Sequence, residues 1–246
     1  MCVSSRFSSL ETLGDPRLIN GLIATAAPRV LCIDDGHVID VWGWFRFLPL
    51  ANETVLYLRS VDLCAEGGTG GYATRHMIFH RCWASGASLS KVLSRFAHLE
   101  TLVLFETDVE GLVSTLIALP TSLQHVHILE DNFEINEDRF ISRLVLPHLE
   151  SFTYTLLSSG TSAPQTPADD DNDGSDANTL AAVQQAVESS IAAPKCTFKF
   201  LCSTASPADA LADALAAFKL DCSFFFFFFV FFFFFFARSP ALLERL

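Results

Sequence analysis

An acidic stretch in the second half of the chain has part of the ligand pattern of a calcium-binding loop. In "DDDNDGSDANTL", Asp169, Asp171 and Asp173 alternate and Gly174 follows them, as in the first half of an EF-hand loop. The twelfth position of such a loop supplies a bidentate glutamate, but here it is Leu180. We therefore predict a solvated acidic linker at this place and no specific calcium site.

Four histidines form two alternating pairs that could be considered as metal ligands. His125 and His127 flank Val126, so both side chains should lie on one face of a strand, and His76 and His80 should share that face. The segment "LETLVLF" reads as a strand between the two pairs, which places them about 10 Å apart. That distance is too large for one ion, so we expect surface histidines and no metal.

The other reactive residue types match no catalytic or cofactor motif. "GGTGG" (67–71) lacks the lysine of a phosphate-binding loop, and we interpret it as a flexible connection. The chain has no G-x-S-x-G, no H-E-x-x-H and no cysteine–histidine signature. We predict a non-enzymatic protein without a cofactor; an enzyme with an unrecognised site is an alternative.

The amino-acid composition limits which cellular compartment and which class of binding partner we expect. The net charge of −12 argues against a nucleic-acid partner, which requires a basic face. The seven cysteines are odd in number and include no C-x-x-C pair, which indicates reduced thiols rather than disulfides or a zinc site. The first residues lack the apolar core of a secretory signal. These features predict a cytoplasmic or nuclear protein.

The elements that must position these residues recur along the chain. Seven apolar, alternating segments predict strands at 30–34, 55–60, 76–82, 98–105, 122–129, 148–155 and 197–203. Their inward anchors are Leu31, Leu56, Met77, Leu102, Val126, Phe152 and Phe198. The anchor spacings are 25, 21, 25, 24, 26 and 46 residues, and five of the six fit the 20–29 residues of leucine-rich repeats.

Helical patterns fill the intervals between the predicted strands. Apolar residues at helical spacing predict helices at 88–96, 111–119, 137–146 and 179–193, with Ser88 as the N-cap of the first. A last helix is predicted from Ser206 as N-cap, with Pro207 in the first helical position. Strands alternating with helices indicate an α/β protein in which stacked units share one core.

The segments "HLETLVLF", "SLQHVHIL" and "HLESFTYT" resemble the L-x-x-L-x-L core of leucine-rich repeats. The stretch "LSRFAHLETLVLF" is similar, more narrowly, to the repeats of fungal F-box/leucine-rich-repeat proteins, with Cys82 at the position of the repeat's asparagine or cysteine. The resemblance implies an α/β solenoid with a parallel sheet on one face and helices on the other. It also implies a role as the substrate-reading part of an F-box-type ubiquitin ligase, with the ligase adaptor as a partner. Residues 1–30 show no F-box pattern.

The alternation within the strands places one set of side chains on the sheet face away from the helices. Aromatic, histidine and basic residues there suggest an exposed face that recognises a protein partner, with an ordinary mixed strand face as the alternative. The predicted interaction residues are Tyr57, Arg59, His76, Ile78, His80, Val103, Phe105, His125, His127, Thr153 and Lys199.

The spacing of 46 residues suggests the domain organisation. Residues 158–178 are rich in Pro, Gly, Ser and Asp, and removing these 21 residues restores a normal repeat, so we predict a disordered insertion. We divide the chain into an N-terminal cap or truncated segment (1–29), a degenerate solenoid (30–219) and a low-complexity tail (220–246).

The tail contains twelve phenylalanines and one valine between Phe224 and Phe236. As a helix, the uncharged run spans about 24 Å, which is short of a bilayer core. Phenylalanine has T-rich codons, so a translated pyrimidine tract at a wrong gene boundary is the interpretation we favour. The alternatives are a tail anchor, which would make this a membrane-tethered repeat protein, and a functional hydrophobic tail.

Overall fold

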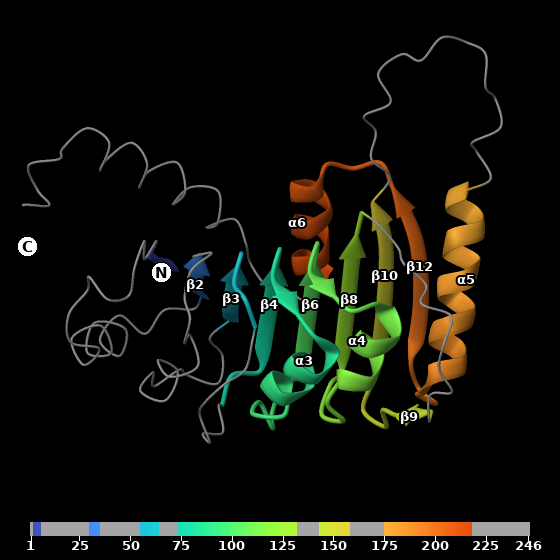
Figure 1. The fold of residues 1–246 in the computed structure, drawn as a ribbon, viewed down its shortest axis with the longest axis horizontal. Coiled ribbons are helices and arrows are strands. Elements are labelled where there is room, and N and C mark those ends of the chain that lie inside the picture. Colours follow the sequence, from blue (N-terminus) through green and yellow to red (C-terminus); the bar gives the residue numbers. More distant parts are fainter. Residues whose placement is uncertain are drawn as a thin grey trace, which may run out of the picture.

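A parallel β-sheet organises the protein. The computed structural model describes residues 2–5, 30–34, 55–63, 73–131, 143–157 and 175–217. The main sheet has eight strands in the order β1-β2-β3-β4-β6-β8-β10-β12, and every neighbouring pair is parallel (Figure 1). The strands are β1 (Cys2–Ser5), β2 (Val30–Asp34), β3 (Val55–Arg59), β4 (His76–His80), β6 (Thr101–Phe105), β8 (His125–Glu130), β10 (Ser151–Leu157) and β12 (Thr197–Ser203).

All seven predicted strands are present, and their register matches the predicted anchors. The chain of directly paired residues is Leu31, Leu56, Met77, Leu102, Val126, Phe152 and Phe198. The strand β1, which pairs with β2, was not predicted from the sequence. Because each strand lies beside its predecessor, the described sheet has no point at which the strand order reverses.

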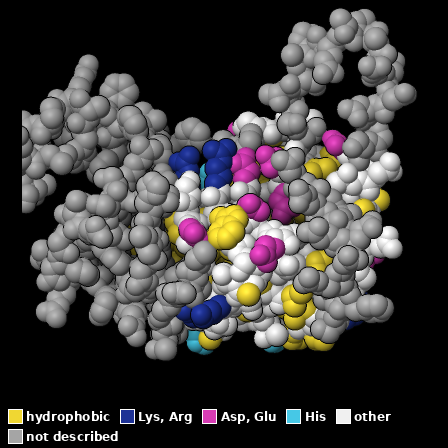
Figure 2. Space-filling view, in the orientation of Figure 1, with side chains coloured by type: hydrophobic (Ala, Val, Ile, Leu, Met, Phe, Trp, Pro, Cys, Tyr) yellow, Lys and Arg dark blue, Asp and Glu magenta, His cyan; other side chains and the backbone are white. Residues whose placement is uncertain are grey.

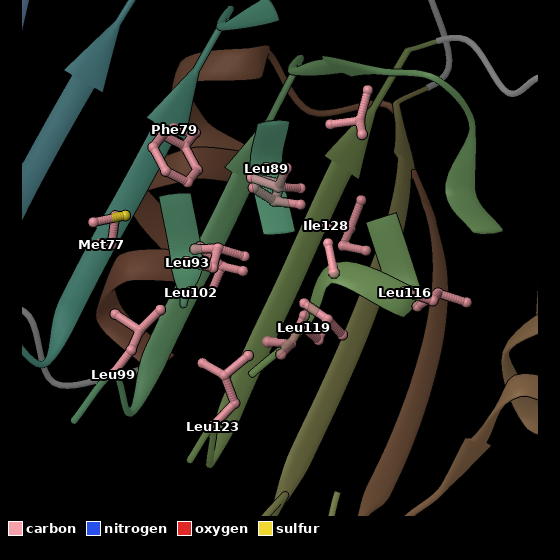
Figure 3. Close-up of a cluster of buried hydrophobic side chains, with 14 of the residues drawn as sticks. Met77, Phe79, Leu89, Leu93, Leu99, Leu102, Leu116, Leu119, Leu123 and Ile128 are labelled. Atoms are coloured by element: carbon pink, nitrogen blue, oxygen red, sulfur yellow. The ribbon is translucent and has the colours of Figure 1, made fainter. Parts of the chain in front are cut away.

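Three helices cover one face of the sheet: α3 (Gly86–Leu93), α4 (Leu112–Ala118) and α5 (Ser175–Ser190). Leu89 and Leu93 from α3 and Leu116 from α4 pack on the strand residues Leu102 and Ile128 (Figure 3). These side chains are no more than 2% exposed, and burial of such apolar surface is the main force that holds the layers together.

The sequence placed one helix boundary incorrectly and another correctly. The N-cap of α3 is Ser85, whose Oγ accepts a hydrogen bond from the backbone N–H of Ser88 at 3.1 Å, so the prediction of Ser88 as N-cap is wrong. Helix α6 (Pro207–Ala217) begins as predicted, because Ser206 Oγ accepts from the N–H of Asp209 at 3.2 Å. Both caps satisfy donors that have no partner within the helix.

Short strands occupy the last residues of two predicted helical stretches. The helix predicted to 193 ends at Ser190, and β11 (Ile191–Ala192) follows it. β11 pairs with β9 (Leu144–Val145), which lies in the stretch predicted as helix 137–146; residues 137–142 lie outside the described residues. The insertion predicted at 158–178 also ends earlier than expected, because α5 already begins at Ser175.

Helix α6 lies on the opposite face of the sheet from α3 and α4, behind β6 and β8 in Figure 1. Its residues Ala210 and Ala214, with Leu211, pack in a second apolar cluster that includes Val103 and Phe105 of β6. The prediction of helices on one face only is therefore wrong, and the described sheet is covered on both faces in this region.

A regular turn follows three successive strands. Ser60, Arg81 and Glu106 each come directly after a strand and have positive φ values of 53°, 52° and 44°. The backbone N–H of each donates to a carbonyl of the next strand, at His80, Phe105 and Leu129 respectively. The chain then enters a second, two-stranded sheet of β5 (Trp83–Ala84) and β7 (Asp108–Val109), which Asp62 joins by an isolated bridge to Trp83.

Three expectations lie outside the described residues. They concern the glycine-rich loop (67–71), residues 169–174 of the acidic segment and the run from Phe224 to Phe236. Within the described ranges, no helix is both long and apolar enough to cross a bilayer.

Candidate functional site

The predicted interaction residues do share one sheet face. The register sets Tyr57, Ile78, Val103, His127, Thr153 and Lys199 in one continuous row across six strands. Arg59, His80 and Phe105 are paired in a second row, and His76 and His125 flank Thr101 in a third. The intervening strand that the sequence predicted between the two histidine pairs is therefore present.

The expected exposure of this face is wrong for five of the eleven residues. Tyr57, Ile78, Val103, Phe105 and His127 are 7%, 1%, 0%, 2% and 8% exposed. Four of them belong to the apolar cluster to which α6 contributes Ala210 and Ala214. Lys199 is exposed, and the remaining residues of the set, Arg59, His76, His80, His125 and Thr153, are partly buried.

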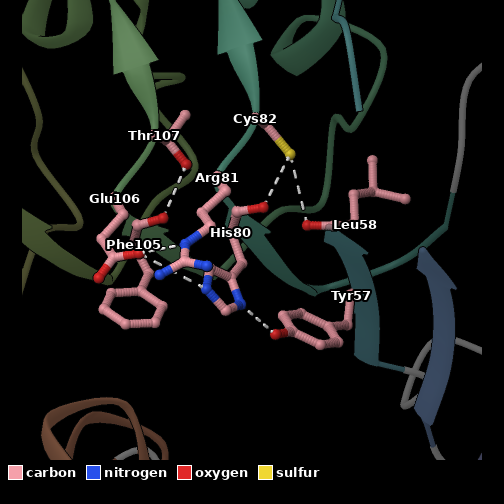
Figure 4. Close-up of polar contacts among 8 residues, drawn as sticks. All are labelled: Tyr57, Leu58, His80, Arg81, Cys82, Phe105, Glu106 and Thr107. Carbon is pink, nitrogen blue, oxygen red and sulfur yellow. Dashed lines mark hydrogen bonds and ion pairs between the residues drawn. The ribbon is translucent and has the colours of Figure 1, made fainter. Parts of the chain in front are cut away.

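Polar side chains gather at the carboxyl end of β3, β4 and β6 (Figure 4). The hydroxyl of Tyr57 lies 2.5 Å from Nδ1 of His80, and the His80 ring is tilted by 37° to the ring of Phe105 with centroids 4.4 Å apart. Arg81 Nε donates to Glu106 Oε2 at 2.5 Å, and the same oxygen is 3.9 Å from His80 Nε2. Desolvation, together with the charges of Arg59 and Arg81, lowers the pKa of His80 to about 4. The imidazole is neutral at physiological pH.

Two of the other predicted histidines, His125 and His127, lie within hydrogen-bond distance of neighbouring hydroxyls. His127 Nε2 lies 3.0 Å from Thr155 Oγ1, and His125 Nδ1 lies 2.9 Å from Ser151 Oγ. Burial lowers the pKa of His127 to about 4, and burial also lowers the pKa of His76. Among the described residues, no three His, Cys, Asp or Glu side chains are grouped so that they could hold a metal ion.

A partly buried carboxyl group, that of Glu130, lies at the end of β8. Tyr154 is fully buried and donates its hydroxyl hydrogen to Glu130 Oε2 at 3.0 Å. Desolvation raises the pKa of Glu130 to about 7, with the charges of Asp131 and Asp108 acting in the same direction and the Tyr154 hydrogen bond opposing them. The pKa of Tyr154 is raised, first by burial and then by Glu130.

Cys82 occupies the turn position that the sequence assigned to the repeat's asparagine or cysteine. Its side chain is 1% exposed, and Sγ lies 3.4 Å from the carbonyl oxygen of Leu58 in the previous unit and 3.6 Å from that of His80. Burial raises the pKa of this thiol to about 11. Cys82 is therefore a neutral thiol that links successive turns and not a nucleophile. Thr107, in the next turn, donates in a similar way to the carbonyl of Phe105 at 3.2 Å.

The sequence missed an exposed row of side chains beside this edge. Asp62, Trp83 and Asp108 are direct partners in three successive turns, and all three are exposed, Trp83 by 48%. The residues that alternate with them, such as Ala84 and Val109, point into the core. The signal in the sequence was the continued alternation of "CWA" beyond the strand, with a tryptophan in the outward position.

The surface near the strand ends is mixed in charge. In Figure 2, basic side chains lie next to acidic ones at the upper edge of the described part, and further acidic side chains surround exposed hydrophobic surface below them. Arg81 is paired with Glu106, so its charge is already compensated. This arrangement leaves a tryptophan and several carboxylates exposed beside one another on the described surface.

Comparisons with known proteins return no match, whether the chain is set against protein-family models, curated proteins or solved structures.

Proposed function

We propose that this protein is a leucine-rich-repeat-like solenoid that acts as a non-enzymatic scaffold for protein–protein recognition. Support for the architecture comes from the register: one apolar anchor per strand pairs directly with the anchor of the next strand along the sheet. Such a stack places equivalent residues of successive units side by side, and repeat proteins use surfaces of this kind for binding.

The recognition surface in this proposal is the set of turns at the carboxyl ends of β3, β4 and β6. The observation that carries it is the exposed row of Asp62, Trp83 and Asp108, which comes from equivalent positions of three successive turns. Part of the sheet face that the sequence favoured is occupied by α6. In the same turns, Arg81 and Glu106 form an ion pair with each other.

A capture experiment with matched variants tests this function. We would use the tagged full chain as bait, with Asp108→Arg in the proposed surface and Asp176→Arg on the exposed part of α5 as the control. We expect the wild type and Asp176→Arg to capture the same partner with saturable binding, and Asp108→Arg to lose that partner. Equal retention by all three baits would contradict the proposed surface.

The same experiment addresses the ubiquitin-ligase role that the resemblance to F-box/leucine-rich-repeat proteins implies. We propose that a ligase adaptor binds through a segment other than the three turns. The adaptor should then co-purify with Asp108→Arg as well as with the wild type. Absence of the adaptor from every capture would contradict the ubiquitin-ligase role and leave the proposed recognition function in place.

A further inference from the structure

An exposed tryptophan lies between two carboxylates in the second sheet. Trp83 is paired with Asp62 on one side and with Asp108 on the other, so their side chains project from the same face about 4.8 Å from strand to strand. Trp83 is 48% exposed, whereas most large apolar side chains of the described residues are buried. Glu110, two residues after Asp108, is also exposed, and its Oε2 accepts from the backbone N–H of Gly86 at 3.4 Å.

This combination has a defined chemical preference. The face of an indole ring attracts a cation through its quadrupole, and carboxylates beside the ring attract the same cation by charge. A guanidinium group satisfies both, because it stacks flat on the ring and offers paired N–H donors to a carboxylate. Arg81, two residues before Trp83 in the chain, is bound to Glu106.

We infer that Trp83, with the carboxylate of Asp108 beside it, binds an arginine side chain of a protein partner. The inference rests on the proposed recognition function and adds the class of segment that is recognised. The backbone under the site is fixed by hydrogen bonds from the N–H of Trp83 to Val61 O at 3.2 Å and from that of Asp108 to Cys82 O at 2.8 Å. The tryptophan is therefore presented on an ordered turn, which limits the entropy lost on binding.

Fluorescence polarisation with a defined probe tests the inference. The probe is a labelled, capped nonapeptide in which three arginines alternate with glycine and serine, titrated with the full chain. We expect Trp83→Ala to weaken binding about two- to five-fold, as for an exposed cation–π contact, and Trp83→Phe to retain most of the affinity. Asp108→Asn should weaken binding to a similar extent, and replacing the arginines of the probe with lysines should also weaken it.

Asp213→Asn is the matched control for non-specific attraction, because it removes the same charge from an exposed position on α6. It should change the affinity less than 1.5-fold, and circular dichroism should show that each variant is folded. If Trp83→Ala binds as the wild type does, or if Asp213→Asn weakens binding as much as Asp108→Asn, the arginine site is overturned. Loss of a captured protein partner with Asp108→Arg would still support the proposed function in that case.

Discussion

The surroundings of Glu130, the last residue of β8, favour the protonated form of its carboxyl group. Burial raises its pKa to about 7, and Tyr154 donates a hydrogen bond to Oε2 at 3.0 Å. In the unfolded chain the same carboxyl has an ordinary pKa near 4.3. Between these two pH values the Glu130 carboxyl is ionised in the unfolded chain but remains mostly protonated in the folded protein. Glu130 therefore lowers the free energy of unfolding progressively as the pH rises from about 4.5 to 7.

The variant Glu130→Gln should therefore gain stability relative to the wild type as the pH rises. Gln keeps an acceptor for Tyr154 but cannot ionise, so the two proteins should differ little at pH 4.5, and the variant should gain roughly 2–3 kcal/mol by pH 7.5. Urea denaturation followed by far-UV circular dichroism measures both values. Taking the difference between variant and wild type cancels the titration of His80 and His127. A pH-independent difference would show that Glu130 ionises normally in the folded protein.

Residue-level exposure was the least predictable property of the candidate site. The alternation correctly set Phe105 and His127 on the face away from α3, because side chains in a strand point to opposite faces in turn. The burial of Phe105 depends in part on α6, which belongs to a later segment and packs on this face through two alanines and a leucine. The sequence around Phe105 does not indicate that a helix from a later segment covers this side chain. Trp83, in contrast, was within reach of the alternation rule and was missed because the strand was taken to end before it.

At the scale of elements, the start of α3 separates two nearby serines with different roles. Ser85 Oγ accepts from the N–H of Ser88, whereas the side chain of Ser88 only accepts from the hydroxyl of Ser85 at 3.0 Å. Ser85→Ala should cost about 1 kcal/mol, because an N–H of the first turn loses its partner. Ser88→Ala leaves that bond intact and should cost less than about 0.5 kcal/mol. Chemical denaturation of both variants decides this, and a larger loss for Ser88→Ala would place the cap where the sequence predicted it.

Helix α6 should detach from the sheet when its contact surface is made polar. Ala214 is 1% exposed and packs in the cluster with Val103 and Phe105, whereas Ala216 in the same helix is exposed. Ala214→Glu would bury an unpaired charge, so we expect faster hydrogen exchange of α6 amides and stronger binding of a hydrophobic dye. Ala216→Glu is the control and should resemble the wild type. Unchanged exchange in Ala214→Glu would show that α6 does not depend on this contact.

The short strands β9 and β11 show where helical periodicity misleads. Val187 and Ile191 are both buried and four residues apart, which fits one helix face, yet the helix ends at Ser190 and Ile191 pairs with Leu144. Arg143 donates to the carbonyl oxygens of Glu188 and Ile191 at 3.4 Å, which satisfies acceptors at the helix end. This end is set by tertiary hydrogen bonds from a residue 45 or more positions away, so the local sequence could not specify it.

At the scale of the whole molecule, strand order and register were predictable because one anchor per unit must reach a common core. A shift of one residue would turn Leu102 away from α3, so burial on the helix side fixes the pairing with Met77 and Val126. The strand β1 was not predictable in the same way, because "CVSS" lacks the apolar alternation of the others, although Val3 pairs with Leu31 at a spacing of 28 residues.

The stacked arrangement predicts that stability falls from the centre of the sheet to its β12 end. β6 has a strand on each side and five buried residues, whereas β12 is the last strand of the described sheet and has none. Leu102→Ala removes a fully buried side chain from β6 and should cost about 3 kcal/mol, while Leu201→Ala, at a position that is 47% exposed in β12, should cost less than about 0.5 kcal/mol.

Native-state hydrogen exchange should show the same gradient in the wild type. Each unit contacts mainly its neighbours, so amides of β12 should open at a lower free energy than those of β6, without unfolding of the central strands. Leu102→Ala should accelerate exchange in β4, β6 and β8 together, because these strands share the cluster that the leucine fills. Equal protection of β6 and β12 in both proteins would indicate a single cooperative unit in place of a stack of repeats.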